Sequence, residues 1–257
     1  MRTLIFYILL FDAILFTGVF WYLEFPWYII LLLFLVFLIF TALASSQIRW
    51  NLFVSSIHSG NKVGNQIALT FDDGPHPVYT PLVLDILKQH QAKASFFLIG
   101  KNAEKYPYLV ERIFEEGHTI GNHSYSHSNT IGFSSKNQWI QEIQSTNLVI
   151  QKIIGKTPKL FRPPFGITTP HLGLALKQTK MTSIGWNHRT FDTAQKNVDA
   201  IVRKLEQNVQ AGSIILLHDS HERIQPLLEQ LLTKLANKNL SFVSLNELLD
   251  EKSYLEV

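Results

Sequence analysis

The sequence predicts an α/β fold, a distorted (β/α) barrel of about seven parallel strands, preceded by an N-terminal transmembrane helical hairpin. Three observations lead to this prediction. The first 48 residues of the 257 are almost free of charge. After residue 65, short apolar runs alternate with longer helix-like stretches. Polar clusters follow five of those runs, where parallel α/β folds carry their functional residues.

An apolar leader opens the chain with two stretches, residues 4–22 and 27–44, which are separated by Glu24 and Pro26. At a helical rise of about 1.5 Å per residue, each stretch is roughly 27–29 Å long, close to the thickness of a bilayer core. A charge and a proline between them would end a helix. We therefore assign residues 1–46 to two transmembrane helices that form a hairpin.

Two other interpretations of the leader remain open. Asp12 would cost roughly 2.5–3.5 kcal/mol at the middle of a bilayer, so a single anchor with an amphipathic or re-entrant partner is one of them. A cleaved signal peptide is the other, because Ala42-Leu43-Ala44 fits a small-x-small cleavage site. A signal peptide does not need two apolar stretches, and this favours the hairpin.

The remainder of the chain has the composition of a globular protein, with residues 47–65 as a polar connector and residues 66–257 as one domain. The net charge is +3 and the pI is about 9.0, but Lys and Arg do not interleave with aromatic residues, so we expect no nucleic-acid partner. The chain has no cysteine, which excludes disulfides, thiolate metal sites and a cysteine nucleophile.

The alternation within this domain predicts a parallel sheet with both faces covered. The apolar runs, which we predict to be strands, are residues 67–71, 94–99, 118–121, 160–162, 182–186, 213–217 and 240–243. The helix-like stretches are residues 81–90, 107–116, 137–154, 170–178, 198–209 and 224–236, and several of them begin with proline, which suits a first helical turn. Seven such units favour an incomplete or distorted barrel over an open sheet.

Polar residues follow five of the predicted strands. Because the carboxyl ends of parallel strands meet at one rim, we expect these residues to converge. In chain order they are Asp72 with Asp73, His123 with His127, Arg162, Arg189 with Asp192, and His218.

Each cluster taken alone has more than one interpretation. Asp72-Asp73-Gly74-Pro75 is also good turn chemistry. His123 and His127, at a spacing of four residues, would face the same way on one helical turn and could share a metal. Two histidines and a carboxylate suit zinc hydrolysis and non-haem iron oxygenation alike. His218 alone could be a core histidine. The other histidines are interpreted as structural or surface residues: His58, His76, His90, His118, His171, His188 and His221.

In this order, the motifs resemble those of the polysaccharide deacetylases, the chitooligosaccharide and peptidoglycan deacetylases of carbohydrate esterase family four. The motifs are Thr70-Phe71-Asp72-Asp73-Gly74, His123-x-x-x-His127, Arg162-Pro163-Pro164-Phe165-Gly166 and Leu216-Leu217-His218. The resemblance extends from about Gln66 to the C-terminus, and it implies a distorted (β/α) barrel with seven strands.

The resemblance also implies a role for each matched position. These are Asp72 as general base, Arg162 to hold Asp72 ionised, His218 as general acid paired with Asp192, the Phe165 backbone N–H as an oxyanion donor, Leu216 in the acetyl-methyl pocket, and Asp73, His123 and His127 as metal ligands. The implied metal is divalent, with Zn²⁺ expected first and other transition metals open. One motif departs from the family, since Arg189 and Thr193 stand where many members have Asp and Trp.

We therefore expect a membrane-bound, metal-dependent hydrolase that removes the N-acetyl group from an N-acetylglucosamine-type sugar in a polysaccharide or cell-wall glycan. The expected partners are that glycan, or a glycolipid, and the lipid bilayer. A deacylase or deformylase of a lipid-linked sugar remains an alternative, as does a catalytically idle glycan-binding membrane protein. We expect a multi-pass protein of the cell membrane. Arg2 and Arg49 favour a cytoplasmic domain, but the resemblance favours substrates outside the cytoplasm, and we predict an extracytoplasmic domain.

Overall fold

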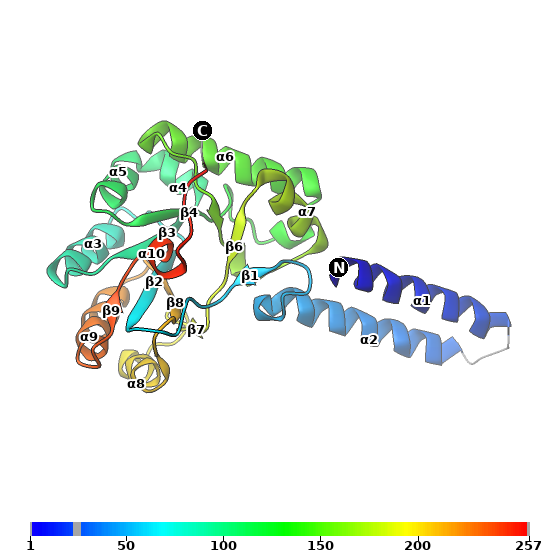
Figure 1. Cartoon of the computed structure of the whole chain (residues 1–257). Coiled ribbons are helices and arrows are strands. Elements are labelled where there is room, and N and C mark those ends of the chain that lie inside the picture. Colours follow the sequence, from blue (N-terminus) through cyan, green and yellow to red (C-terminus); the bar gives the residue numbers. More distant parts are fainter. Residues whose placement is uncertain (1, 23–26, 256–257) are drawn as a thin grey trace.

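A curved sheet of parallel strands forms the centre of the molecule (Figure 1). The computed structural model describes residues 2–22 and 27–255, and within them the sheet has nine strands in the order β1-β6-β5-β4-β3-β2-β8-β7, with β9 also paired to β2. The strands are β1 (Ser56–Ile57), β2 (Gln66–Asp72), β3 (Ala94–Leu98), β4 (Thr119–Asn122), β5 (Leu160–Phe161), β6 (Thr182–Ile184), β7 (His188–Arg189), β8 (Ile214–His218) and β9 (Ser241–Phe242).

The sheet curves into an incomplete barrel because one extended segment, residues 182–189, serves both of its sides. The first part of this segment is β6, which pairs with β5, and the last part is β7, which pairs with β8. The predicted parallel α/β fold is confirmed, and the seven predicted strands correspond to β2–β6, β8 and β9. The two-residue strands β1 and β7 were not predicted.

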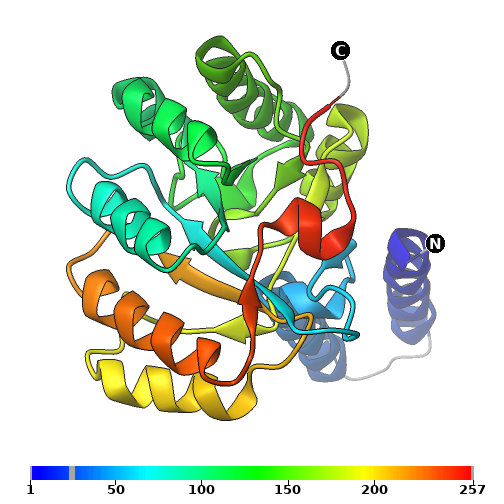
Figure 2. The same ribbon diagram turned by 60° about the vertical axis from the view of Figure 1, so that its left-hand side comes forward.

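Helices α3 to α9 cover the outside of the sheet (Figure 2). They are α3 (Tyr79–Gln89), α4 (Gly100–Lys105), α5 (Pro107–Glu115), α6 (Lys136–Ile154), α7 (Pro170–Thr179), α8 (Val198–Asn208) and α9 (Ile224–Ala236). The short helix α10 (Leu245–Leu249) instead packs against side chains of the inner face. The chain also has 3₁₀ turns η1 (Ile48–Trp50), η2 (Ile131–Phe133) and η3 (Pro164–Gly166). Local sequence signals mark several starts. Proline opens α5 and α7, and Ser135 and Gln138 form a capping box at α6.

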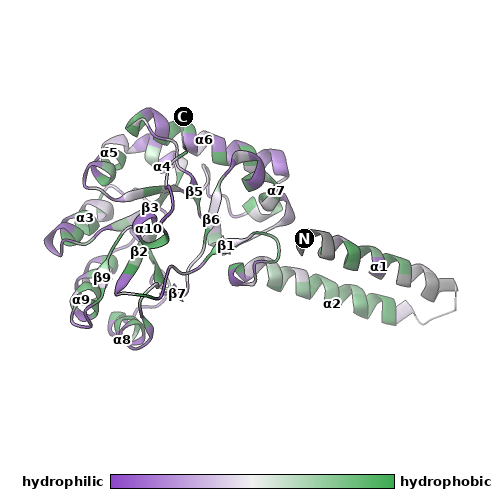
Figure 3. Cartoon of the chain, viewed as in Figure 1, coloured by the Kyte–Doolittle hydropathy of each residue, from purple (hydrophilic) through white to green (hydrophobic). Residues whose placement is uncertain are grey.

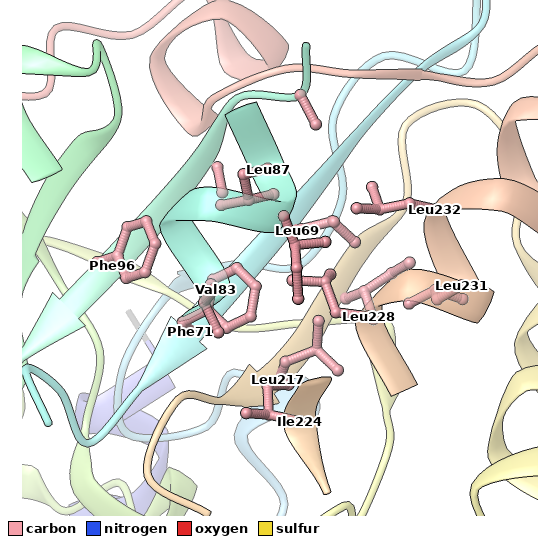
Figure 4. Packing of buried hydrophobic residues seen from close by; sticks show 14 of the residues in the cluster. Leu69, Phe71, Val83, Leu87, Phe96, Leu217, Ile224, Leu228, Leu231 and Leu232 are labelled. Atoms are coloured by element: carbon pink, nitrogen blue, oxygen red, sulfur yellow. The ribbon is translucent and has the colours of Figure 1, made fainter. Parts of the chain in front are cut away.

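The alternation of side chains along the central strands decides which residues reach the inside of the barrel. On β2, Leu69 and Phe71 point outward and pack with α3 and α9 in the main hydrophobic core (Figure 4). The other face of β2 carries Thr70 and, at its end, Asp72. The same alternation on β8 places His218 on the inner face. The two strands are in register, with Asp72 opposite His218.

The leader forms two helices, α1 (Arg2–Tyr22) and α2 (Trp27–Ser46), which lie side by side and project from the domain (Figure 1). Within the described residues, α2 is the one helix long and apolar enough to cross a membrane (Figure 3). Only 6% of its most apolar stretch is buried. In α1 the described apolar stretch is Phe6–Leu15. Residues 23–26, where the hairpin turn is predicted, lie outside the described residues.

The end of α2 and the segment after it pack onto the domain. Ala44 is buried in a cluster with Phe53 and Val54, and the backbone N–H of Thr168 donates to the Ser45 carbonyl at 2.9 Å. The segment predicted as a polar connector, residues 47–65, therefore contains buried apolar side chains as well as η1 and β1.

Candidate active site

A cavity of about 270 Å³ opens at the carboxyl end of the barrel. It is lined by Asp72, Asp73, His123, His127, Phe165, Gly166, Trp186, Arg189, Thr193, Leu216 and His218. The predicted convergence of the five polar clusters is thus confirmed for these residues. Arg162 and Asp192 contact two of them from behind the cavity wall.

Three of the lining residues are placed to hold a metal ion. Ligand atoms of Asp73, His123 and His127 all lie within 4.8 Å of one another, and Asp73 Oδ1 is 3.5 Å from His123 Nε2 and 3.3 Å from His127 Nε2. His123 Nδ1 donates to the Arg162 carbonyl at 2.8 Å. Because a carbonyl can only accept, this bond fixes the ring with a proton on Nδ1, so Nε2 is the atom that would bind a metal once its own proton is lost. Two imidazole nitrogens and one carboxylate oxygen fit a divalent transition metal.

The two histidines do not lie on a helical turn, and that part of the prediction is wrong. Residues 123–127 form a loop after β4, with Ser124 and His127 in left-handed conformation at φ 64° and 48°. The loop is held from outside its own sequence, since the Glu142 carboxylate accepts the backbone N–H groups of Tyr125 and Ser126. The histidines converge because of this loop, not because of helical periodicity.

The turn that carries Asp73 is braced by a residue the sequence analysis assigned no role, Asp219. Asp73 itself is left-handed, with φ 73°. A Cβ on Gly74 would lie 2.6 Å from Oδ2 of Asp219, so only glycine fits between the turn and this carboxyl. Thr80 donates its hydroxyl to Asp219, and burial raises the pKa of Asp219 to about 7.

The carboxylate of Asp73 is ionised despite its burial. Burial alone would raise the pKa of Asp73, but the hydrogen bond with His123 and the charges of His123, His127 and His218 outweigh it and lower the pKa to about 2. An anionic ligand at this place suits a divalent cation.

Arg162 holds Asp72 from a fully buried position. One guanidinium nitrogen donates to Asp72 Oδ1 and to the Thr70 hydroxyl, both at 2.8 Å. Its other nitrogens donate to the carbonyls of Ile184 and Gly185. With its hydrogen bonds distributed in this way, Arg162 is a fixed cation that orients Asp72.

His218 and Asp192 form a second buried pair. The Asp192 carboxylate accepts from His218 Nδ1 at 2.8 Å and from the His218 backbone N–H at 2.9 Å. Burial disfavours the charged imidazole, but the hydrogen bond to Asp192 and the Asp192 charge raise the pKa of His218 to about 9. Burial would also raise the pKa of Asp192, yet hydrogen bonds from His218 and His221 hold it well below its usual range.

His221, which the sequence analysis left as a structural or surface residue, belongs to this second pair. Its Nε2 lies 3.1 Å from Asp192 Oδ2. Its position three residues after His218 is the signal that could have suggested the contact. Trp186 was also missed, because it was assigned only to a predicted strand.

Phe165 and Leu216 both line the cavity. Phe165 is left-handed at φ 59° within η3, and its ring lies 4.5 Å from the ring of His127. No acceptor for the Phe165 backbone N–H occurs among the described residues, so this donor is available to a ligand. Leu216 is 2% exposed and lines the cavity as an apolar wall.

The residues of the departing motif lie at the mouth of the cavity. Arg189 and Thr193 are both exposed and both line it. The Arg189 guanidinium lies over the ring of Phe191 at 4.8 Å and near that of Trp186 at 5.5 Å.

Comparison with known proteins agrees with this site. A family model described as polysaccharide deacetylase matches residues 59–184. A Bacillus cereus protein named peptidoglycan-N-acetylglucosamine deacetylase is 39% identical over 185 residues, which are 70% of this chain and 66% of that protein. Bacillus subtilis PdaC, named a peptidoglycan-N-acetylmuramic acid deacetylase, is 34% identical over 190 residues, 74% of this chain and 40% of that protein.

A solved structure gives the same result with fuller coverage. The crystal structure of a peptidoglycan N-acetylglucosamine deacetylase is 36% identical, with a TM-score of 0.71, and the match covers 76% of this chain and 93% of that one. The chain therefore belongs to the polysaccharide deacetylase family and is, by that membership, a hydrolase of the N-deacetylase class.

Proposed function

We propose that this protein is a membrane-anchored, metal-dependent deacetylase of cell-wall glycan, which removes the acetyl group from an N-acetylglucosamine-type sugar. The observation that carries the proposal is the presence, around one cavity, of two separately held proton-transfer groups beside a metal-ligand triad. Asp72 is held by Arg162, and His218 is held by Asp192. Binding a glycan without hydrolysing it would require neither pair, and this argues against a catalytically idle glycan-binding protein.

In this proposal Asp73, His123 and His127 hold the divalent cation, with Zn²⁺ expected first. When bound, such a cation polarises the acetamide carbonyl and makes a water molecule a better nucleophile. Asp72 accepts the proton of that water, and its hydrogen bond to Arg162 keeps the carboxylate aimed into the cavity. The Phe165 N–H supports the charge that develops on the carbonyl oxygen.

His218 completes the reaction by donating a proton to the leaving nitrogen. Its raised pKa supports this role, because the imidazole is then protonated at neutral pH. Water is consumed, the amide C–N bond breaks, and the products are acetate and a free amino group on the sugar. Leu216 forms the apolar wall against which the acetyl methyl group packs.

The proposed location is the cell membrane, with the catalytic domain outside the cytoplasm. α2 supports an anchor, since its apolar side chains are exposed along its length. The Phe6 ring stacks on Phe37 at 5.9 Å, and this contact supports α1 as the second member of a hairpin. The relatives named as peptidoglycan deacetylases support the extracytoplasmic side.

A second candidate, deacylation or deformylation of a lipid-linked sugar, is favoured by one contact. Thr168, two residues beyond η3, donates its backbone N–H to Ser45 at the end of α2. The loop that carries Phe165 is therefore tied directly to the proposed anchor, and this tie would keep the loop near the surface from which α2 emerges.

Product analysis by mass spectrometry tests both candidates. Purified full-length protein with Zn²⁺ is incubated with chitooligosaccharides, peptidoglycan fragments and lipid-linked N-acetyl sugars. We expect loss of acetyl groups and equimolar acetate from the glycans. Turnover of the lipid-linked sugars alone would favour the second candidate. No product from any of the three, with metal bound, would contradict both.

A further inference from the structure

A cationic side chain at the mouth of the cavity, Arg189, has no role in the proposed deacetylation. Arg189 is exposed and lines the cavity together with Thr193, Trp186 and His218. It does not hold Asp72, because Arg162 already does so. It does not hold Asp192 either, whose carboxylate is bonded by His218, His221 and Thr190.

The guanidinium of Arg189 is held in orientation by aromatic rings, but its N–H donors are not used in hydrogen bonds within the part of the chain that the structure describes. The rings of Phe191 and Trp186 lie 4.8 and 5.5 Å from it, and such stacking restrains the guanidinium plane while leaving its edge open. Within residues 2–22 and 27–255, no carbonyl, hydroxyl or carboxylate accepts a hydrogen bond from this side chain, and none forms an ion pair with it. Its N–H donors are therefore free to bind a ligand.

The other arginines near the cavity behave differently. Arg162 is fully buried and each of its nitrogens has an acceptor. Arg223, near the same motif, donates to the carbonyls of Asp192 and Thr193. Of these three arginines, Arg189 is the one whose N–H donors have no acceptor among the described residues.

We propose that Arg189 forms an anion subsite, which selects N-acetylated sugars that carry a carboxylate or phosphate near the acetamido group. A guanidinium presents paired N–H donors that match either oxyanion in bidentate geometry. This inference rests on the proposed deacetylase function and names the class of substrate. Its site lies within the cavity, so the oxyanion must belong to the sugar under attack or to the residue next to it.

The proposal predicts a loss that depends on substrate charge. Hydrogen bonds to a charged group at a partly solvated site correspond to roughly a tenfold change in affinity. In Arg189→Gln, kcat/KM for an anionic substrate should fall roughly tenfold, mainly through KM, while a neutral substrate changes by less than about twofold. Arg189→Lys should retain part of the preference, since it keeps the charge without the planar fork.

The experiment uses matched substrates with the full-length protein in detergent. The carboxylate arm is an oligosaccharide of alternating N-acetylglucosamine and N-acetylmuramic acid, compared with the same oligosaccharide after amidation of its carboxyl groups. The phosphate arm is a lipid-linked N-acetylglucosaminyl diphosphate, compared with an uncharged alkyl glycoside of N-acetylglucosamine in the same micelles. Arg203→Gln, an exposed change on α8, is the matched control for the lost positive charge.

The outcomes distinguish a carboxylate from a phosphate as the ligand of Arg189. They also distinguish failure of the anion subsite from failure of the proposed deacetylase function. Arg189-dependent discrimination in one arm identifies carboxylate or phosphate as the ligand. Equal losses on charged and neutral members of both pairs, or no preference in the wild type, would overturn the subsite. If the wild type turns over none of these substrates, the Kd values of the charged and neutral members of each pair are measured with Asp72→Asn. These values then show whether the site prefers the charged member. Discrimination in binding alone would uphold the subsite while contradicting the proposed function.

Discussion

At the scale of single residues, the proposed site divides its work between groups that would bind metal and groups that would move protons. Asp73, His123 and His127 are the proposed ligands, and their ligand atoms lie close to one another. Asp72, although adjacent in sequence to Asp73, is bound by Arg162 instead. The left-handed backbone at Asp73 helps to direct the two carboxylates differently.

This division predicts opposite behaviour for two substitutions. Asp72→Asn should retain about one metal per chain and lose at least roughly a hundredfold in turnover, because it removes the base and spares the ligands. His123→Ala should lose the metal, since two protein ligands rarely hold Zn²⁺ tightly. Elemental analysis after gel filtration measures both. If Asp72→Asn lost the metal and His123→Ala kept it, the assignment of Asp72 as the base and His123 as a metal ligand would be contradicted.

The His218–Asp192 pair predicts a shift in pH dependence. A general acid must be protonated, and with a pKa raised to about 9 the imidazole loses its proton, and the enzyme its activity, as the pH rises through that value. Asp192→Asn removes the charge that raises the pKa while burial, which lowers it, remains. The alkaline limb of kcat/KM should therefore move to lower pH.

The matched control for this shift is Asp199→Asn, which removes one negative charge from the exposed face of α8. Its pH profile should follow the wild type. An unchanged alkaline limb in Asp192→Asn would show that His218 is not the acid on which the rate depends.

Residue types and their positions after predicted strands were enough to predict most of the site residues. They were not enough to predict the contacts that hold those residues in place. Asp72, Asp73, His123, His127 and His218 could be found because each follows an apolar run. Asp219 follows the same apolar run as His218, but its contacts with the Gly74 turn and with Thr80 could not be predicted, because they join distant parts of the sequence. The stacking of Arg189 between Phe191 and Trp186 could not be predicted either, because it depends on how the chain folds after β7.

At the scale of elements, the long amphipathic helices and the strands within apolar runs were predictable, and β1 and β7 were not. α9 matches its predicted range, and β2 matches to within one residue at each end. β5 and β9 are as short as β1 and β7, but they lie within apolar runs, whereas β1 and β7 lie in mainly polar sequence. They form because neighbouring strands offer hydrogen-bonding edges, and this is a property of the tertiary fold.

The packing of α9 on β2 and β8 gives a test of the core that supports the site. Leu228 is fully buried in that interface (Figure 4). Leu228→Ala should lower the free energy of unfolding by about 2–5 kcal/mol. Leu174→Ala makes the same chemical change at a position 46% exposed on α7, and it should cost much less. Urea unfolding followed by tryptophan fluorescence measures both, and equal losses would contradict the core assignment.

At the scale of the whole molecule, the leader and the catalytic domain are joined more closely than a flexible tether would require. Ala44 is buried against Phe53, and Thr168 bonds to Ser45. The sequence marked both parts from composition alone. It could not show that they touch, because the contacts, which include the rings of Phe6 and Phe53 at 5.3 Å, join residues far apart in the sequence.

This junction leads to a prediction about the side of the membrane on which the domain lies. If α2 spans the bilayer, the short connection keeps the catalytic cavity near the surface from which Ser45 emerges. Arg2 and Arg49, which flank the leader, favour the cytoplasmic surface by the positive-inside rule, but two flanking cations are a weak determinant. A glycan substrate in the cell wall requires the opposite surface, and we expect that one.

Protease added to intact spheroplasts measures the outcome through a tag fused to the C-terminus. An extracytoplasmic domain should lose the tag before lysis, while a cytoplasmic marker protein in the same cells stays intact. If the tag survives until the membrane is lysed, the domain is cytoplasmic. Cell-wall glycan would then be out of reach, and the tie between α2 and the loop of Phe165 would point to a lipid-linked sugar on the inner leaflet as the substrate.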